Sequence, residues 1–96
     1  MTMFDYEGKS YSLEITRAGV REAEKQGLNI TEIDDKPWSM LGLLFYAALY
    51  KQRVPLGRAL GMLDDLLDTK VLNVKELMSE LSDAYSELFG LDEPED

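Results

Sequence analysis

The sequence contains no cysteine and no histidine among its 96 residues. Without cysteine, the chain can form no disulfide bond, thiolate nucleophile or cysteine-based zinc site. Without histidine, it lacks the side chain that most often serves as general base and as transition-metal ligand. The glycines form no phosphate-binding loop, and no serine or lysine has an evident activating base. We therefore expect a binding protein with no enzymatic activity and no cofactor.

Basic residues are also scarce, because ten Lys and Arg stand against nineteen Asp and Glu, for a net charge of -9. Residues 1–59 carry eight acidic and eight basic residues, whereas residues 60–96 carry eleven acidic residues and only Lys70 and Lys75. An acidic half repels phosphates, so we expect neither nucleic acid nor membrane as a partner. Two alternatives remain for this half: a solvated helical face, or an acidic surface that meets a basic partner or mimics nucleic acid.

The N-terminus, MTMFDYEGK, lacks the basic region and apolar run of a signal peptide. The length suffices for one domain with a small core but not for a deep catalytic cleft as well. We therefore expect a cytoplasmic protein with a single globular domain over residues 1–91. Residues 92–96 are acidic, contain a proline and have nothing to bury, which predicts a disordered tail.

The most apolar segment runs from Pro37 to Tyr50 (PWSMLGLLFYAALY), where eleven of fourteen residues are apolar and none is charged. Proline suits the first turn of a helix, so the segment predicts a helix that begins near Pro37. That helix would be ~21 Å long at ~1.5 Å per residue, which is too short for a bilayer core of ~30 Å. A helix that is apolar on nearly every side belongs at the centre of a fold.

Helical geometry divides the large side chains of this segment into two groups. At about 100° per residue, one face carries Trp38, Leu41, Phe45 and Leu49. Met40, Tyr46 and Tyr50 lie off that face. A small domain is expected to leave part of such a helix uncovered for association. The predicted partner-binding residues are Trp38, Met40, Tyr46 and Tyr50.

The remaining patterns predict one hairpin and three more helices. Apolar and polar residues alternate over residues 3–15 with a break at Gly8–Lys9, which is typical of a β-hairpin. Thr16 is a candidate N-cap for a helix that runs to Gln26, and Gly27 supplies its C-terminal stop. Leucines recur at helical spacing after Pro55, and Asn73 starts the last helix with a capping residue.

Together these elements predict an α+β fold that is mostly helical, with an N-terminal β-hairpin packed on a bundle of about four helices. Leu44, Leu63 and Leu81, each on a different helix, are expected to be buried.

Asp64, Asp65 and Asp68 match the short DDxxD pattern that holds magnesium in terpenoid synthases. Those enzymes bury the pattern in a far larger helical cavity with a second acidic motif. In this chain the three aspartates lie opposite the leucine stripe of their own helix. We therefore expect an exposed acidic face and no metal site.

Several segments in a fixed order resemble the small tail assembly chaperones of tailed phages and prophages. They are the FDYEGKSYSLE hairpin, the helix that ends in EKQGLNI, the DDKPW step and the LLFYAALY helix. The resemblance covers residues 4–50 and extends more loosely to the helix around Leu77–Tyr85, with the weakest match over residues 51–73. It implies a non-enzymatic protein that binds the long tape-measure protein before the tail tube polymerises around it.

The resemblance and the charge leave different partners open. As a tail assembly chaperone, the chain would bind the tape-measure protein, with the tail tube protein and a second copy of the chain as further candidates. The main alternative is an acidic inhibitor that mimics nucleic acid and acts on a basic protein. A helical transcription regulator is disfavoured because the chain has no basic helix.

The absence of a metal site predicts that thermal unfolding does not depend on chelators. The melting temperature should be the same with and without EDTA, and magnesium should change it only by general screening. Calorimetry that detected a tight, stoichiometric magnesium site, lost on substitution of Asp64 and Asp68, would contradict this expectation.

Overall fold

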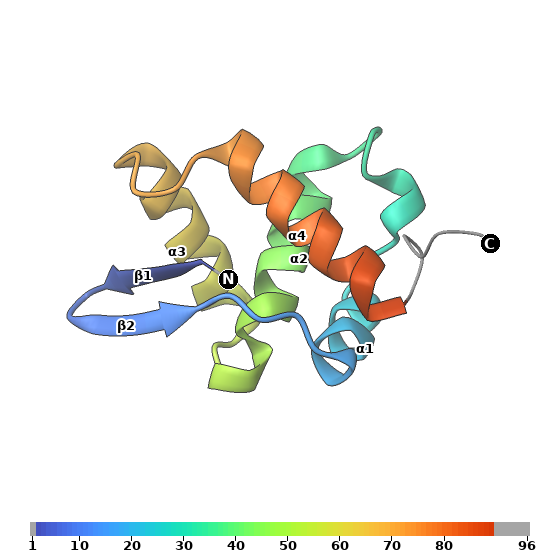
Figure 1. Cartoon of the computed structure of the whole chain (residues 1–96), viewed down its shortest axis with the longest axis horizontal. Coiled ribbons are helices and arrows are strands. Elements are labelled where there is room, and N and C mark those ends of the chain that lie inside the picture. The colour runs from blue at the N-terminus through green and yellow to red at the C-terminus, as the bar shows by residue number, and fades with distance from the viewer. Residues whose placement is uncertain (1, 90–96) are drawn as a thin grey trace.

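The computed structural model describes residues 2–89, which form one hairpin, four α-helices and two short 3-10 helices (Figure 1). In chain order the elements are β1 (Met3–Tyr6), β2 (Lys9–Ser12), α1 (Arg17–Lys25), η1 (Ile30–Glu32), α2 (Pro37–Leu49), η2 (Tyr50–Gln52), α3 (Leu56–Asp68) and α4 (Val74–Phe89). The predicted mostly helical α+β architecture is confirmed. The predicted end of the domain at residue 91 and the tail over residues 92–96 lie outside the described residues.

Helix α2 lies at the centre of the molecule, with α4 across it and α1 and α3 on either side (Figure 1). Every residue of α2 from Met40 to Leu49 is buried, as its lack of charge predicts. The predicted burial of Leu44, Leu63 and Leu81 is confirmed, since their exposed fractions are 0%, 3% and 1%. Within residues 2–89, no helix combines the length and the apolar character needed to cross a membrane.

The hairpin turns at Glu7–Gly8, one residue earlier than predicted. Tyr6 pairs with Lys9, and both turn residues have positive φ, 52° at Glu7 and 81° at Gly8. Two successive positive φ values identify the type I′ turn, whose twist matches that of the flanking strands. The sequence signal was weak because a glutamate fills a position where asparagine, aspartate or glycine is usual.

The apolar face of the hairpin packs on α2 through aromatic rings. The ring of Phe4 stacks on that of Tyr11, its partner across the strands, at 5.6 Å between centroids. It also stacks on Phe45 of α2 at 6.0 Å. This contact supplies the cover that a two-stranded hairpin needs in water.

Residues 13–15 were predicted to continue the strand, but β2 ends at Ser12. The N–H of Leu13 still donates to the carbonyl of Thr2 at 2.9 Å, but the hydrogen bonds on either side of it go to η2 and to the end of α2. The side-chain amide of Gln52 accepts from the Ser12 N–H at 3.1 Å and donates to the Ser12 carbonyl at 2.6 Å. The N–H of Glu14 then donates to the carbonyl of Ala48 at 3.0 Å.

The predicted helix caps are confirmed. The hydroxyl of Thr16 accepts from the N–H of Gly19 at 3.0 Å, and the side-chain oxygen of Asn73 accepts from the N–H of Glu76 at 3.0 Å. Gly27 follows α1 with a φ of 114°, a conformation that favours glycine. These local signals fix where the surface helices begin and end.

Helix α1 approaches α2 most closely at Gly19. A methyl group added there would lie 3.1 Å from Cβ of Tyr50 and 3.2 Å from the carbonyl carbon of Ala47, and closer still to the Ala47 oxygen. Two of these three atoms belong to the backbone of α2, which cannot rotate away. Gly19 therefore sets the distance between the two helices.

We predict that Gly19→Ala lowers the free energy of unfolding by about 1–3 kcal/mol, because α1 must move away from a well-packed neighbour. Gly61→Ala is the matched control, since a methyl group there would meet nothing within 4 Å and the residue lies inside α3. This control should stabilise the protein by about 0.5–1 kcal/mol through helix propensity. Urea denaturation followed by circular dichroism measures both. Equal stabilisation by the two substitutions would show that α1 and α2 do not approach as described.

Candidate functional site

The structure separates the four predicted partner-binding residues into two buried and two exposed side chains. Met40 and Tyr46 are 3% and 7% exposed, so both belong to the core, which corrects their assignment to an uncovered face. The segment with η1 contacts α2, and the N–H of Asn29 donates to the sulfur of Met40 at 3.4 Å. Burial also raises the pKa of the Tyr46 hydroxyl, and the nearby negative charge of Glu22 adds to this effect.

Trp38 is the residue of this group that offers the most surface. Its side chain is 66% exposed in the first turn of α2, although it shares a helical face with the buried Leu41, Phe45 and Leu49. It lies at an open groove between α2 and α3 with a volume of about 490 Å³. The groove is lined by Gln26, Trp38, Ser39, Gly42, Leu43, Leu56, Leu60, Leu63 and Asp64. We call it the Trp38 groove.

Leu60 is the other exposed large apolar residue of the Trp38 groove, with an exposed fraction of 40%. A methyl group on Gly42 would lie 2.6 Å from a terminal carbon of Leu60, so this glycine lets the leucine rest against α2. The spacing of Leu60 fits the leucine stripe of its helix, although the side chain is exposed. The sequence pattern contains no signal that distinguishes a leucine at the edge of the stripe from one at its centre.

Tyr50, which is 36% exposed, lies at the other end of α2. Twelve residues separate it from Trp38, which corresponds to about 18 Å along a helix. Tyr50 lines a separate pocket with Tyr46, Lys51, Arg53, Val54 and Pro55. Trp38 of α2 and Tyr50 of η2 therefore do not form one surface.

The aspartates of α3 are exposed, as predicted, and one of them has a structural contact. The hydroxyl of Tyr6 donates to the carboxylate of Asp65 at 2.5 Å, which ties the hairpin to α3. This hydrogen bond, with smaller effects of desolvation and nearby negative charge, raises the pKa of Tyr6 to about 12. Within residues 2–89, no three acidic side chains are placed so that they could hold a metal ion together.

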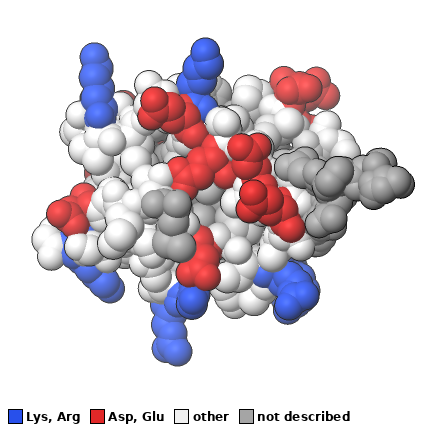
Figure 2. All heavy atoms as spheres, viewed as in Figure 1, with Lys and Arg blue, Asp and Glu red and all other residues white. Residues whose placement is uncertain are grey.

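The acidic half of the chain concentrates much of its charge on α4. Figure 2 shows acidic side chains at the centre of the face that α4 crosses, with Lys and Arg at its margins. The acidic residues of α4 are Glu76, Glu80, Asp83 and Glu87, and its single basic residue is Lys75. Their spacing of three and four residues places them along one side of the helix. A negative stripe of this kind favours basic partners.

Comparison with known proteins assigns the chain to a family. A family model described as "Domain of unknown function (DUF5055)" matches residues 1–94. The chain belongs to this family. No curated protein and no solved structure matches it. The family description names no activity, so the function of this DUF5055 member has to be argued from its surfaces and its sequence.

The hydrogen bond between Tyr6 and Asp65 predicts a pH dependence. The pKa of Tyr6 is about 12 in the folded chain against a reference value of 10.0, so the folded state holds the phenol proton more tightly. The stabilising contribution is therefore complete below pH 10 and is lost as the pH rises from 10 to 12. In an ultraviolet titration of the five tyrosines, Asp65→Asn should move the titration of one of them towards pH 10.

Asp64→Asn is the control, because it removes the same charge from an adjacent exposed position on α3. It should leave the tyrosine titration unchanged. Identical curves for the parent and for Asp65→Asn would contradict the assignment, and so would an equal shift in both variants.

Proposed function

We propose that the protein is a tail assembly chaperone of a tailed phage or prophage. It binds the tape-measure protein in the cytoplasm of the bacterial host and keeps it in solution until the tail tube forms. It acts by binding and carries out no chemical reaction. The observation that carries the proposal is the exposed Trp38 beside an apolar groove, together with the order of segments that resembles this family of chaperones.

The Trp38 groove has the features of a site for an apolar helix. Tryptophan is among the side chains that contribute most to protein interfaces, because it buries a large rigid surface. Leu60 and Leu56 extend the apolar surface next to it, on α3. A long helical partner exposes apolar stripes before the tail tube forms around it. Such a stripe fits a groove between two helices.

The charge of the chain supports the same role. A net charge of -9 favours solubility. Complexes of this chain with an aggregation-prone partner would carry that charge and repel one another. The tail tube protein and a second copy of the chain are the other candidate occupants of the groove.

A second candidate function is an acidic inhibitor that occupies the nucleic-acid site of a basic protein. The negative stripe of α4 favours it. Gene order distinguishes the two functions at little effort. A tail-tube gene upstream and a very long gene downstream support the chaperone, whereas a neighbouring restriction or nuclease gene supports the inhibitor.

Co-expression with the tape-measure protein encoded beside it tests the proposal. We expect the wild type to keep the tape-measure protein in the supernatant after lysis, and Trp38→Gln/Leu60→Gln to lose most of this effect. Both side chains are exposed, so the double variant should keep the melting temperature of the parent. Val71→Gln is the control, because this exposed valine lies outside the groove.

Trp38 also reports directly on occupancy, because it is the only tryptophan of the chain. A purified tape-measure segment should shift its fluorescence emission to shorter wavelength as the indole leaves water. The proposal is wrong if the folded wild type retains no tape-measure segment, or if the double variant solubilises as well as the parent. Capture of a nuclease through the acidic half would support the inhibitor instead.

A further inference from the structure

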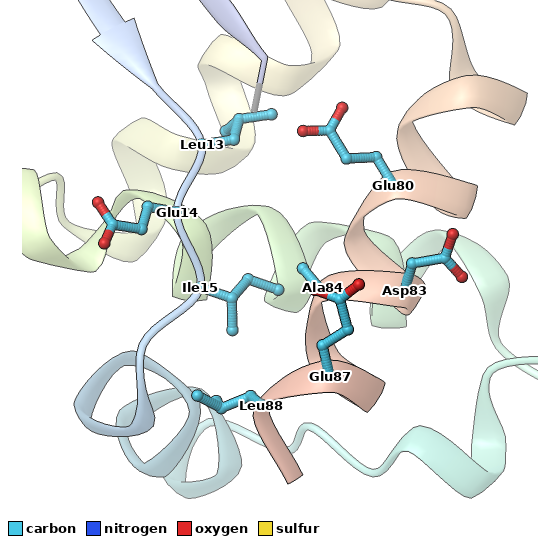
Figure 3. A pocket seen from close by; sticks show the side chains of 8 residues that line it. All are labelled: Leu13, Glu14, Ile15, Glu80, Asp83, Ala84, Glu87 and Leu88. Atoms are coloured by element: carbon cyan, nitrogen blue, oxygen red, sulfur yellow. The ribbon is translucent and has the colours of Figure 1, made fainter. Parts of the chain in front are cut away.

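A second groove lies between α4 and the segment that joins β2 to α1, and its volume is about 660 Å³ (Figure 3). It is lined by Leu13, Glu14, Ile15, Glu80, Asp83, Ala84, Glu87 and Leu88. We call it the α4 groove. It shares no lining residue with the Trp38 groove, so the two can be occupied and tested separately.

The floor of the α4 groove is apolar. Figure 3 shows Leu13 and Ile15 on the β2–α1 segment facing α4, which contributes Ala84 and Leu88. Leu13 is buried, whereas Ile15, Ala84 and Leu88 are only partly covered. The partly covered side chains leave apolar surface at which a partner could exclude water.

One side of the α4 groove carries negative charge that the chain does not neutralise. In the described part of the chain, neither Asp83 nor Glu87 forms an ion pair. Glu80 is already engaged, since it accepts hydrogen bonds from the N–H and the hydroxyl of Thr2. Glu14 pairs with Lys51 at 3.2 Å and points away from α4 in Figure 3. The charge available to a partner therefore comes mainly from Asp83 and Glu87.

We propose that the α4 groove binds a basic amphipathic helix of another protein. The apolar side of that helix would lie on Ile15, Ala84 and Leu88, and its Lys or Arg side chains would face Asp83 and Glu87. These two acidic residues are four positions apart, or about 6 Å along α4. Basic residues at the same spacing on a helix that runs beside α4 would meet both of them. Complementary charge of this kind selects the partner and speeds association.

A second copy of this chain fits the groove less well. Helix α1 carries exposed basic residues at helical spacing, namely Arg17, Arg21 and Lys25. Its large apolar residue, Val20, is 1% exposed in its own core. Helix α1 of a second copy could therefore offer charge but no large apolar side chain to the floor of the groove. A foreign helix with both properties satisfies the two sides of the site.

The test uses a labelled synthetic helix of about 18 residues, built from Leu and Lys with all leucines on one face, and measures its Kd by fluorescence anisotropy. Asp83→Asn/Glu87→Gln should weaken binding about fivefold at physiological salt, because two exposed ion pairs are lost. Asp34→Asn/Asp35→Asn is the matched control, since it removes the same charge at exposed positions outside the groove. It should leave the Kd within about twofold of the parent, as screening suppresses distant charges.

A scrambled peptide of the same composition, which has no apolar face, should bind much more weakly than the amphipathic one. Equal binding of the two peptides, equal weakening by the two double variants, or no binding of the amphipathic peptide would each overturn the proposal. Concentration-dependent dimerisation of the chain alone, lost in Asp83→Asn/Glu87→Gln, would assign the groove to a second copy and also overturn it.

This inference does not depend on the chaperone function, and one readout keeps the two apart. The emission of Trp38 should stay unchanged while the peptide binds, because Trp38 does not line the α4 groove. Trp38→Gln/Leu60→Gln should bind the peptide as the parent does. A shift of the Trp38 emission on peptide addition would place the peptide in the other groove and overturn the assignment.

Discussion

The need to cover α2 determines the arrangement of every other element. This helix has no charged residue, so most of its surface has to be removed from water. A domain of this size has few residues with which to cover it. The hairpin covers it through the stacked rings of Phe4 and Phe45, and α1 reaches it at the distance that Gly19 allows. The hydrogen bonds of Ser12 to Gln52 of η2 and of Glu14 to Ala48 of α2 hold the connecting chain in place. The Trp38 groove lies where this cover is incomplete.

Features set by neighbouring residues could be predicted from the sequence, and features set by distant contacts could not. The caps of α1 and α4 follow from Thr16 and Asn73, whose side chains bond to the backbone three residues on. The alternation at residues 13–15 suggested a longer strand. It carries no sign that the N–H of Glu14 bonds to α2 instead of to a neighbouring strand. The turn was misplaced by one residue for a related reason, since nothing local marks Glu7 as a residue with positive φ.

The candidate site shows the same limit more strongly. The angular position of a residue on a helix says which residues share a face, but not which neighbouring element covers that face. Met40 proved to be covered by the segment with η1, whereas Trp38 is exposed in the first turn although it shares a face with buried residues of α2. The leucines on α3 that complete the Trp38 groove have the same spacing as the buried leucines of that helix, so the sequence pattern did not distinguish them. The negative charge was easier to place, because the acidic residues of α4 follow one another at three- and four-residue spacing and must therefore share one side of the helix.

The two grooves differ in the physical term that would drive binding, and salt separates them. Attraction between the carboxylates of the α4 groove and a basic helix weakens as the Debye length falls from about 10 Å at 0.1 M to about 3 Å at 1 M salt. Burial of the indole of Trp38 and of Leu60 removes apolar surface from water and gains strength with salts that are excluded from protein surfaces. A partner that engages Trp38 should stay bound in high sulfate, whereas one held by Asp83 and Glu87 should be released by high salt. The salt dependence of any complex therefore indicates which groove carries it, before a single residue is changed.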